Sequence, residues 1–278
     1  MVTRKNYLLA FLQYALLIFM SILVLLPIVV VFSASFKTSA EFNSTSAFTL
    51  PTFEAGFSAY ITAFTKGKML KAFLNTAILI VFTCVGSVLT GSMTAYVLNR
   101  FRFRARKLIY NLFMWIALIP AITAQVATFQ IIQFLGLYNK MAGYIVLSMG
   151  TDILSIMIYL QFLRNISSSL DESAIIDGAN YLEVFAKIIF PLLQPATVTI
   201  IILKCVNVYN DFYNPLLYMP KSSLLVISTS LYKFKGPFGT AWNVISAGVI
   251  ITVIPTFILF MLLQKYIYSG MATGSVKE

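Results

Sequence analysis

The sequence contains no histidine, only two cysteines and few charged residues for its length. Of its 278 residues, 10% are charged and 59% are hydrophobic. Without histidine, the chain lacks the side chain most used for proton transfer near neutral pH and for binding transition metals. We therefore expect no metal site. Cys84 and Cys205 both lie within apolar runs, where we expect small buried side chains rather than a disulfide or metal ligands.

Two sequence motifs that would indicate an enzyme are also absent. There is no G-x-S-x-G, which marks a nucleophilic serine. There is no G-x-x-x-x-G-K-[ST] either, because Lys66-Gly67-Lys68-Met69 lacks both the upstream glycine and the hydroxyl residue. We predict that the chain is not an enzyme and does not itself hydrolyse ATP.

What the sequence does contain is a series of apolar runs long enough to cross a lipid bilayer. The first follows Arg4 and Lys5 and is too long for the apolar part of a cleaved signal peptide. We predict an all-α, polytopic membrane protein whose residues 1–278 form one transmembrane domain. The six predicted spans cover approximately residues 7–32, 73–98, 109–134, 144–163, 188–209 and 242–268.

The basic residues indicate how these spans are oriented. The formal net charge is +11, but the basic residues lie mostly at the ends of apolar runs, so we expect a membrane and its lipid as partners and no nucleic acid. The densest group is the short loop at 99–107, and such loops stay in the cytoplasm. This loop can also contact anionic lipid from that side. Six spans then place both termini in the cytoplasm, although the lysines sort between the two sides less cleanly than the arginines.

A polar stretch interrupts the apolar runs between Leu170 and Pro191. Ser169 with Glu172, and Asn180 with Glu183, match the capping-box pattern that begins a helix. Gly178 lies between them and can adopt the left-handed conformation that ends one. We predict two short helices broken at Gly178, the second continuing into the fifth span. The first helix is too short to be stable in water without a partner surface.

The same stretch resembles a motif of a known family. Glu172-Ser173-Ala174, then Gly178, then Ile188-Ile189-Phe190-Pro191 resembles the EAA loop of the inner-membrane subunits of bacterial binding-protein-dependent ABC importers. Serine replaces the second residue of E-A-A and phenylalanine replaces the leucine of I-x-L-P, whereas the spacing is intact. Fixed positions over about twenty residues make this a specific signal.

Further similarity covers nearly the whole chain and points to the carbohydrate branch of the family, resembling the second subunit of the maltose permease pair. It includes Ser35-Phe36-Lys37, the basic loop at 99–107, and Asn210-Asp211-Phe212 with Pro215-Leu216. The final segment at 270–277 resembles the G-L-T-A-G-A-V-K tail of that branch.

The resemblance implies a type I ABC importer permease fold in the bacterial cytoplasmic membrane. It implies a subunit that moves a sugar or oligosaccharide from a solute-binding protein into the cytoplasm. The implied partners are a second, related permease subunit in a heterodimer and two ABC ATPase subunits, which hold the ATP and Mg; this chain would bind no cofactor. Permeases for a polyol or a glycerol-phosphate compound share the branch, and an ion-coupled secondary transporter is an alternative from outside it.

The resemblance also assigns roles to individual residues. The cytoplasmic loop at 164–187 would dock into a cleft of the ATPase. Acidic residues there would hold basic groups and apolar residues would fill the cleft; the predicted coupling residues are Leu170, Glu172, Ala174, Ile175, Asp177 and Gly178. An amphipathic helix lying on the membrane is the alternative, but such helices are normally basic on the polar face. The loop before the last span would contact the binding protein through Phe234, Lys235, Gly236, Pro237 and Phe238.

The substrate pathway is predicted from polar and aromatic residues within the spans, which suit sugar hydroxyl groups. The candidates are Gln125, Gln130, Asp152, Asn207, Tyr209, Asn210 and Asp211; each could instead bond to another helix. Asp152 and Lys204 are the conspicuous ionisable residues, and such residues usually face a cavity or a partner. Asp152 could alternatively cap a helix, and Lys204 could extend its ammonium group towards the membrane surface.

Overall fold

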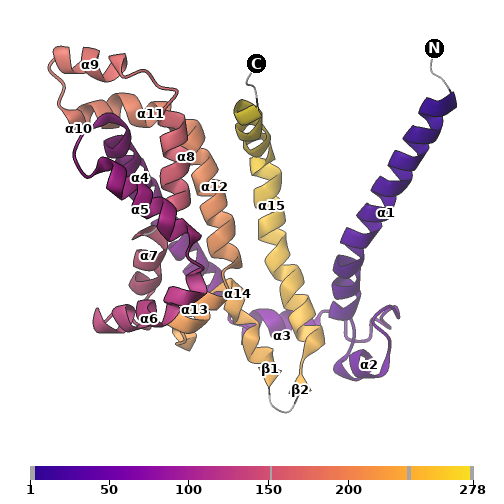
Figure 1. The fold of residues 1–278 in the computed structure, drawn as a ribbon. Helices are drawn as coiled ribbons and strands as arrows, with labels where there is room; N and C mark the ends of the chain where they lie inside the picture. Colours follow the sequence, from indigo (N-terminus) through magenta and orange to yellow (C-terminus); the bar gives the residue numbers. More distant parts are fainter. Residues whose placement is uncertain (1–3, 151, 237–238, 276–278) are drawn as a thin grey trace. The chain divides into compact units, whose positions relative to one another are not determined.

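The structure is a computed structural model that describes residues 4–150, 152–236 and 239–275 (Figure 1). Its helices divide into two compact units, which we treat separately. The first comprises residues 1–70 and 230–259, and the second comprises residues 71–229 and 260–278.

The first unit begins with α1 (Arg4–Ser35), a single 32-residue helix that continues through Pro27. Its apolar segment Leu9–Ser35 is long enough to cross a membrane, and no residue in the most apolar window is buried within the chain. A helix that is apolar all round, with its most apolar stretch unburied, is suited to lipid or to another subunit.

The polar, Ser- and Thr-rich segment after α1 contains two short helices. It contains α2 (Ser39–Ser44), which a capping box of Thr38 and Glu41 begins, and α3 (Ser58–Lys66).

The S-F-K sequence after α1 holds this segment together. Ser35 Oγ lies 2.7 Å from Tyr60 Oη, and the ring of Phe36 packs against that of Tyr60. Lys37 is only 1% exposed, and its ammonium donates to Thr45 Oγ1 at 3.0 Å and to the Ser46 carbonyl at 2.9 Å. These contacts satisfy a buried charge, so the three residues of this motif have a structural role here.

The first unit ends with the region around α15 (Trp242–Ser275), a 34-residue helix that belongs partly to each unit. A short hairpin of β1 (Lys235–Gly236) and β2 (Gly239–Thr240) precedes it. Asn243 Nδ2 donates to the Lys37 carbonyl at 3.1 Å, which ties the start of α15 to the S-F-K sequence.

The second unit contains the other membrane helices. They are α4 (Met69–Arg100), α5 (Arg106–Leu118), α6 (Gln125–Phe134), α7 (Met141–Gly150), α8 (Ile153–Leu163) and α12 (Gln194–Asn210). The shorter helices are α9 (Ser169–Ile176), α10 (Tyr181–Val184), α11 (Phe190–Leu192), α13 (Tyr213–Tyr218) and α14 (Ile227–Ser230). In Figure 1, α9, α10 and α11 lie together beyond one end of α8 and α12.

Two predicted spans are bent rather than straight. The third, predicted at 109–134, breaks near Pro120 into α5 and α6, whose axes differ by 96°. Ile119 takes an extended conformation, as residues before proline prefer. The fifth, predicted at 188–209 as a continuation of the polar stretch, bends by 74° at Leu193. Pro195 follows the bend and has no N–H to continue the helical hydrogen bonding across it.

Within the described residues, three segments are long and apolar enough to cross a membrane, Leu9–Ser35, Met69–Arg100 and Met141–Leu163, and two bent helix pairs bring the number to five. The apolar segment Trp242–Ile258 of α15 is a sixth region of similar character. This arrangement agrees with the predicted all-α membrane fold and is consistent with six spans.

Candidate functional site: the elbow at 168–193

The polar stretch folds into an elbow, which we define as residues 168–193. It begins differently from the prediction. The N-cap of α9 is Ser168, without a side-chain cap, and Glu172 N donates to the Ser168 carbonyl at 3.1 Å. The predicted capping box of Ser169 with Glu172 is wrong, because Ser169 lies inside the helix and its N–H donates to Ser167 Oγ at 3.2 Å.

The end of α9 follows the prediction closely. Gly178 has φ +89°, and its N–H donates to the Ile175 carbonyl at 3.0 Å. The N–H of Ala179 donates to the Ala174 carbonyl, also at 3.0 Å, which completes a Schellman motif. A Cβ placed on Gly178 would meet no atom within 4 Å, so glycine is required by the backbone conformation rather than by space.

The second arm of the elbow begins with the predicted capping box. Asn180 Oδ1 accepts from Glu183 N at 3.0 Å, and Asn180 N donates to Glu183 Oε2 at 3.1 Å. Glu183 also pairs with Lys187 at 3.2 Å. The bond from the Asn180 N–H, and then the Lys187 ammonium, lower the pKa of Glu183. A π-helical turn, Phe185–Ile189, leads from α10 to α11.

Asp171 anchors the elbow to the end of α4. Its Oδ2 lies 3.0 Å from Arg100 Nε, and its Oδ1 accepts from Tyr96 Oη at 3.0 Å. Arg100 Nη2 also donates to the Ile166 carbonyl at 2.9 Å, just before α9. The side chains of Arg100 and Asp171 are about one-tenth exposed. Sequence reasoning missed Asp171 because nothing in the local pattern says that this acid faces α4.

An apolar core supports the elbow from beneath. Val184, Ile189 and Leu193 are fully buried and belong to the same cluster as Leu163 of α8 and Tyr96 of α4. Burying side chains of this size stabilises a fold by about 1.5–3 kcal/mol each. The elbow is therefore packed on two membrane helices and can move with them.

The outward face of α9 differs in part from the predicted coupling residues. Ala174 is 7% exposed and packs in the apolar cluster, so the prediction that it fills a cleft in a partner is wrong. Leu170, Ile175 and Ile176 are 42%, 39% and 85% exposed. Glu172 and Asp177 are also exposed. Ile176 was missed, although it is the most exposed apolar side chain of the helix.

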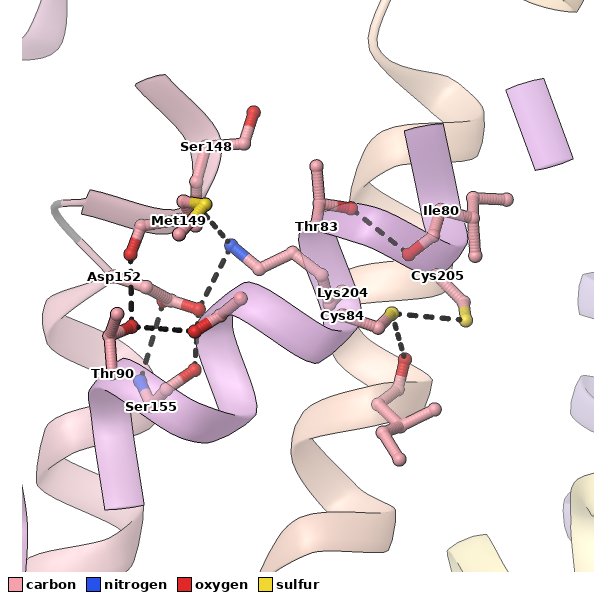
Figure 2. A network of polar contacts seen from close by, with 12 residues as sticks. Ile80, Thr83, Cys84, Thr90, Ser148, Met149, Asp152, Ser155, Lys204 and Cys205 are labelled. Atoms are coloured by element: carbon pink, nitrogen blue, oxygen red, sulfur yellow. Dashed lines mark hydrogen bonds and ion pairs between the residues drawn. The ribbon is translucent and has the colours of Figure 1, made fainter. Parts of the chain in front are cut away.

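Asp152 and Lys204 form a buried ion pair within the membrane helices (Figure 2). The carboxylate Oδ2 lies 2.9 Å from the ammonium, which also donates to the Ser148 carbonyl at 3.0 Å. Asp152 caps α8 as well, since its Oδ1 accepts from Ser155 N at 3.4 Å. The capping alternative is thus correct for Asp152, whereas Lys204 is held inside rather than extended to the membrane surface.

The other predicted pathway residues are not brought together into one site. Asn207 lines a small crevice of about 30 Å³ with Asp152 and Lys204. Gln125 accepts from Tyr213 Oη at 3.0 Å, and Asn210 donates to the Val206 carbonyl at 3.0 Å. Asp211 accepts from Tyr144 Oη at 2.8 Å and from Asn214 N at 3.1 Å, so its carboxylate holds α7 and α13 together.

The remaining two pathway candidates differ in exposure: Gln130 is exposed, whereas Tyr209 is half-buried.

In the predicted binding-protein loop, Phe234 ends a 3-10 helix and Lys235 and Gly236 form β1. The predicted contacts Pro237 and Phe238 lie outside the described residues.

Cys84 and Cys205 are both free thiols, with their sulfur atoms 3.8 Å apart between α4 and α12. Within the part of the chain that the structure describes, no group of three or more Cys, Asp or Glu residues is placed to hold a metal ion.

Comparison with solved structures identifies a matching fold. A chain in the crystal structure of a bacterial ABC transporter involved in the import of the acidic polysaccharide alginate superposes with a TM-score of 0.82. The match covers 95% of this chain and 98% of that one, at 24% sequence identity. The type I ABC importer permease fold is therefore confirmed.

Sequence comparison then gives the family. The model of the binding-protein-dependent transport system inner membrane component matches residues 87–273, and the chain belongs to this family. It is 30% identical over 280 residues to a probable starch degradation products transport system permease protein of Thermoanaerobacterium thermosulfurigenes, covering 99% and 98% of the two chains. It is 28% identical over 254 residues to a melibiose/raffinose/stachyose import permease of Bacillus subtilis, covering 91% of each. The predicted resemblance is thus confirmed.

Proposed function

We propose that the chain is one of two permease subunits of a bacterial ABC importer for a sugar or oligosaccharide. A solute-binding protein delivers the substrate, and two ATPase subunits that hold ATP and Mg drive the transport. The observation that carries this proposal is the elbow, which combines a rigid internal anchor with an exposed outer face, in a chain of this family.

The elbow has the properties of a mechanical link. Its inner side is fixed to α4 through Asp171 and Arg100, and its apolar core packs on α8. Its outer side presents Leu170, Ile175 and Ile176 beside Glu172 and Asp177. A short, anchored element of this kind can transmit a movement of the ATPase to the membrane helices, because it has few ways to deform on its own.

The contacts of the elbow also support a proposed orientation in the membrane. Arg100, near the start of the basic run at 99–107, bonds to Asp171 and to the Ile166 carbonyl, so the start of this run lies next to the elbow. Short basic loops remain in the cytoplasm, so the elbow would face the ATPase there. Both termini would then be cytoplasmic, and the β1–β2 hairpin would face the binding protein on the outer side.

The substrate class follows from the relatives. The starch-product and melibiose/raffinose/stachyose permeases, together with a galactooligosaccharides permease of Bacillus subtilis at 30% identity, favour an oligosaccharide. A sulfoquinovosyl glycerol permease of Agrobacterium fabrum at 26% identity keeps glycosylated glycerol compounds in the set to be tested. Asn207, beside the Asp152–Lys204 pair, is the pathway candidate that we consider best placed, because it shares their crevice.

The experiment is a substrate screen on the reconstituted importer, with both permeases, the ATPase and the binding protein. We expect ATP hydrolysis to rise several-fold with binding protein plus one member of a panel of oligosaccharides, and not with binding protein alone. Uptake by the permease subunits alone, driven by an ion gradient, would instead establish a secondary transporter. Stimulation only by a polyol or a glycerol phosphate would change the substrate class and leave the rest of the proposal standing.

A further inference from the structure

A basic cleft lies where α4 ends, α5 begins and α8 ends. Its volume is about 460 Å³, and five cationic side chains line it. They are Arg102, Arg104, Arg106, Lys107 and Arg164. No acidic residue is among the described residues that line the cleft, and none of these five cations forms an ion pair within the described part of the chain. A concave site with uncompensated positive charge attracts anions.

Arg100 belongs to the same basic run, but its charge is neutralised within the chain. Its guanidinium pairs with Asp171 at 3.0 Å and donates to the Ile166 carbonyl at 2.9 Å. The chain therefore neutralises the one arginine of this run that it uses as an internal anchor. The cations around the cleft have no such acid, which leaves their charge for a ligand from outside the chain.

The start of α5 adds to the positive electrostatic potential of the cleft. Its N-cap is Ala105, which offers no side-chain acceptor to the first N–H groups, and the first turn contains no acidic residue. A helix N-terminus carries partial positive charge, and here Arg106 and Lys107 add to it instead of opposing it. An anion in the cleft would offset both contributions.

The cleft also has an apolar side. Leu98, Phe103 and Leu160 share its lining with the cations. A second cleft of about 410 Å³ adjoins it through Tyr110, Leu160 and Arg164. It extends along α8 to Met157, with Gln161 and Asn165 also in its lining. The cationic part of the site suits a charged lipid head group, and the groove between membrane helices suits the lipid chains.

We infer that this cleft binds the phosphate-bearing head group of an anionic phospholipid, such as phosphatidylglycerol. The guanidinium groups would hold the phosphate through charge-assisted hydrogen bonds, and the lipid chains would follow the groove of α5 and α8. The bound lipid would join the end of α4, the start of α5 and the end of α8, which line the cleft. This inference does not depend on which substrate the importer carries.

The test compares two variants of the full chain in its purified membrane complex. One is Arg102→Gln/Arg104→Gln/Arg106→Gln. The matched control is Lys66→Gln/Lys140→Gln/Lys221→Gln, which removes the same charge from exposed positions that do not line the cleft. Phosphatidylglycerol retention is measured by native mass spectrometry, with phosphatidylcholine as the neutral probe. Each basic residue near an anionic membrane contributes about fivefold to lipid affinity, so we expect the first variant to lose on the order of a hundredfold and the control to lose little.

Three results would overturn the assignment. The first is equal retention of phosphatidylglycerol by both variants. The second is full displacement of the lipid by millimolar inorganic phosphate, which would make the ligand a soluble anion. The third is loss of the ATPase subunit, but not of lipid, from the arginine variant, which would make the cleft a protein interface. Because the variant complex could assemble poorly, a photo-crosslinking residue at Tyr110 in the otherwise unchanged chain gives a second readout, expected to capture phosphatidylglycerol rather than peptide.

Discussion

Arg100 Nε lies 3.0 Å from Asp171 Oδ2, which joins the last residue of a 32-residue membrane helix to the first turn of α9. With the hydroxyl of Tyr96 on the other carboxylate oxygen, this contact makes the elbow an extension of α4. Any force that moves α9 is therefore applied directly to a membrane helix.

The first prediction concerns this anchor. Asp171→Asn removes the acid that compensates Arg100, and breaking a buried ion pair from one side typically costs about 3 kcal/mol. We expect the ATPase to remain bound through the exposed face of α9, while substrate-stimulated ATP hydrolysis and transport fall at least about tenfold. Tyr96→Phe removes only one hydrogen bond, worth about 1 kcal/mol, and should have a smaller effect in the same direction.

Glu54→Gln serves as the control for Asp171→Asn, because it removes an exposed acid in the other unit. Transport assays in membrane vesicles and co-purification of the ATPase provide the two readouts. Normal substrate-stimulated hydrolysis by the Asp171→Asn complex would show that the anchor has no part in coupling.

The second prediction concerns Gly178. Its φ of +89° excludes β-branched residues, and a side chain there would meet no neighbouring atom, so the cost comes from the backbone alone. Gly178→Val should leave membrane insertion intact and abolish both transport and assembly with the ATPase. Gly178→Asn, which tolerates a positive φ, should retain most of both. If the valine variant transports normally, the turn at the elbow is dispensable.

The third prediction concerns the ion pair of Asp152 with Lys204. Asp152→Asn keeps a capping side chain but removes the charge, and Lys204→Met removes the other charge, so each leaves its partner buried and unpaired. We expect each single variant to reduce the free energy of unfolding by about 3 kcal/mol. The measurement is the midpoint of thermal unfolding in detergent, which should fall.

The double variant Asp152→Asn/Lys204→Met decides whether the two residues act as a pair. It contains no unpaired charge, so its stability should exceed that of either single variant. Strictly additive losses of stability in the double variant would contradict a direct interaction.

Much of the elbow could be predicted from the sequence, because its signals are local. The turn at Gly178 and the Asn180–Glu183 capping box depend only on contacts between residues close in sequence. Both are found as predicted. The Ser169–Glu172 box has the same pattern but fails, because the helix begins one residue earlier than the pattern indicates, with Ser168 as its N-cap. The anchor could not be foreseen, because 70 residues of sequence separate Arg100 from Asp171 and only the tertiary fold joins them.

The same limit applies within the membrane. Asp152 and Lys204 were each recognised as unusual, but their pairing depends on how α8 packs against α12. The hydropathy pattern also could not predict the bends at Pro120 and Leu193, because it gives the length of an apolar segment and not the direction of the helix axis. Ala174 belongs to the motif by its spacing, yet the side of α9 that it occupies is set by the core beneath the elbow.

The most direct measurement is site-specific cross-linking from Ile176, the most exposed apolar side chain of α9. With Cys84 and Cys205 replaced by alanine, Ile176→Cys in the assembled importer would receive a bifunctional thiol reagent, and Glu54→Cys would serve as the control position. Coupling predicts a cross-link from position 176 to the ATPase subunit. It also predicts that the yield of this cross-link changes when ATP is trapped in the complex. Labelling of position 176 by lipid-soluble reagent, with no cross-link to the ATPase in any nucleotide state, would contradict it.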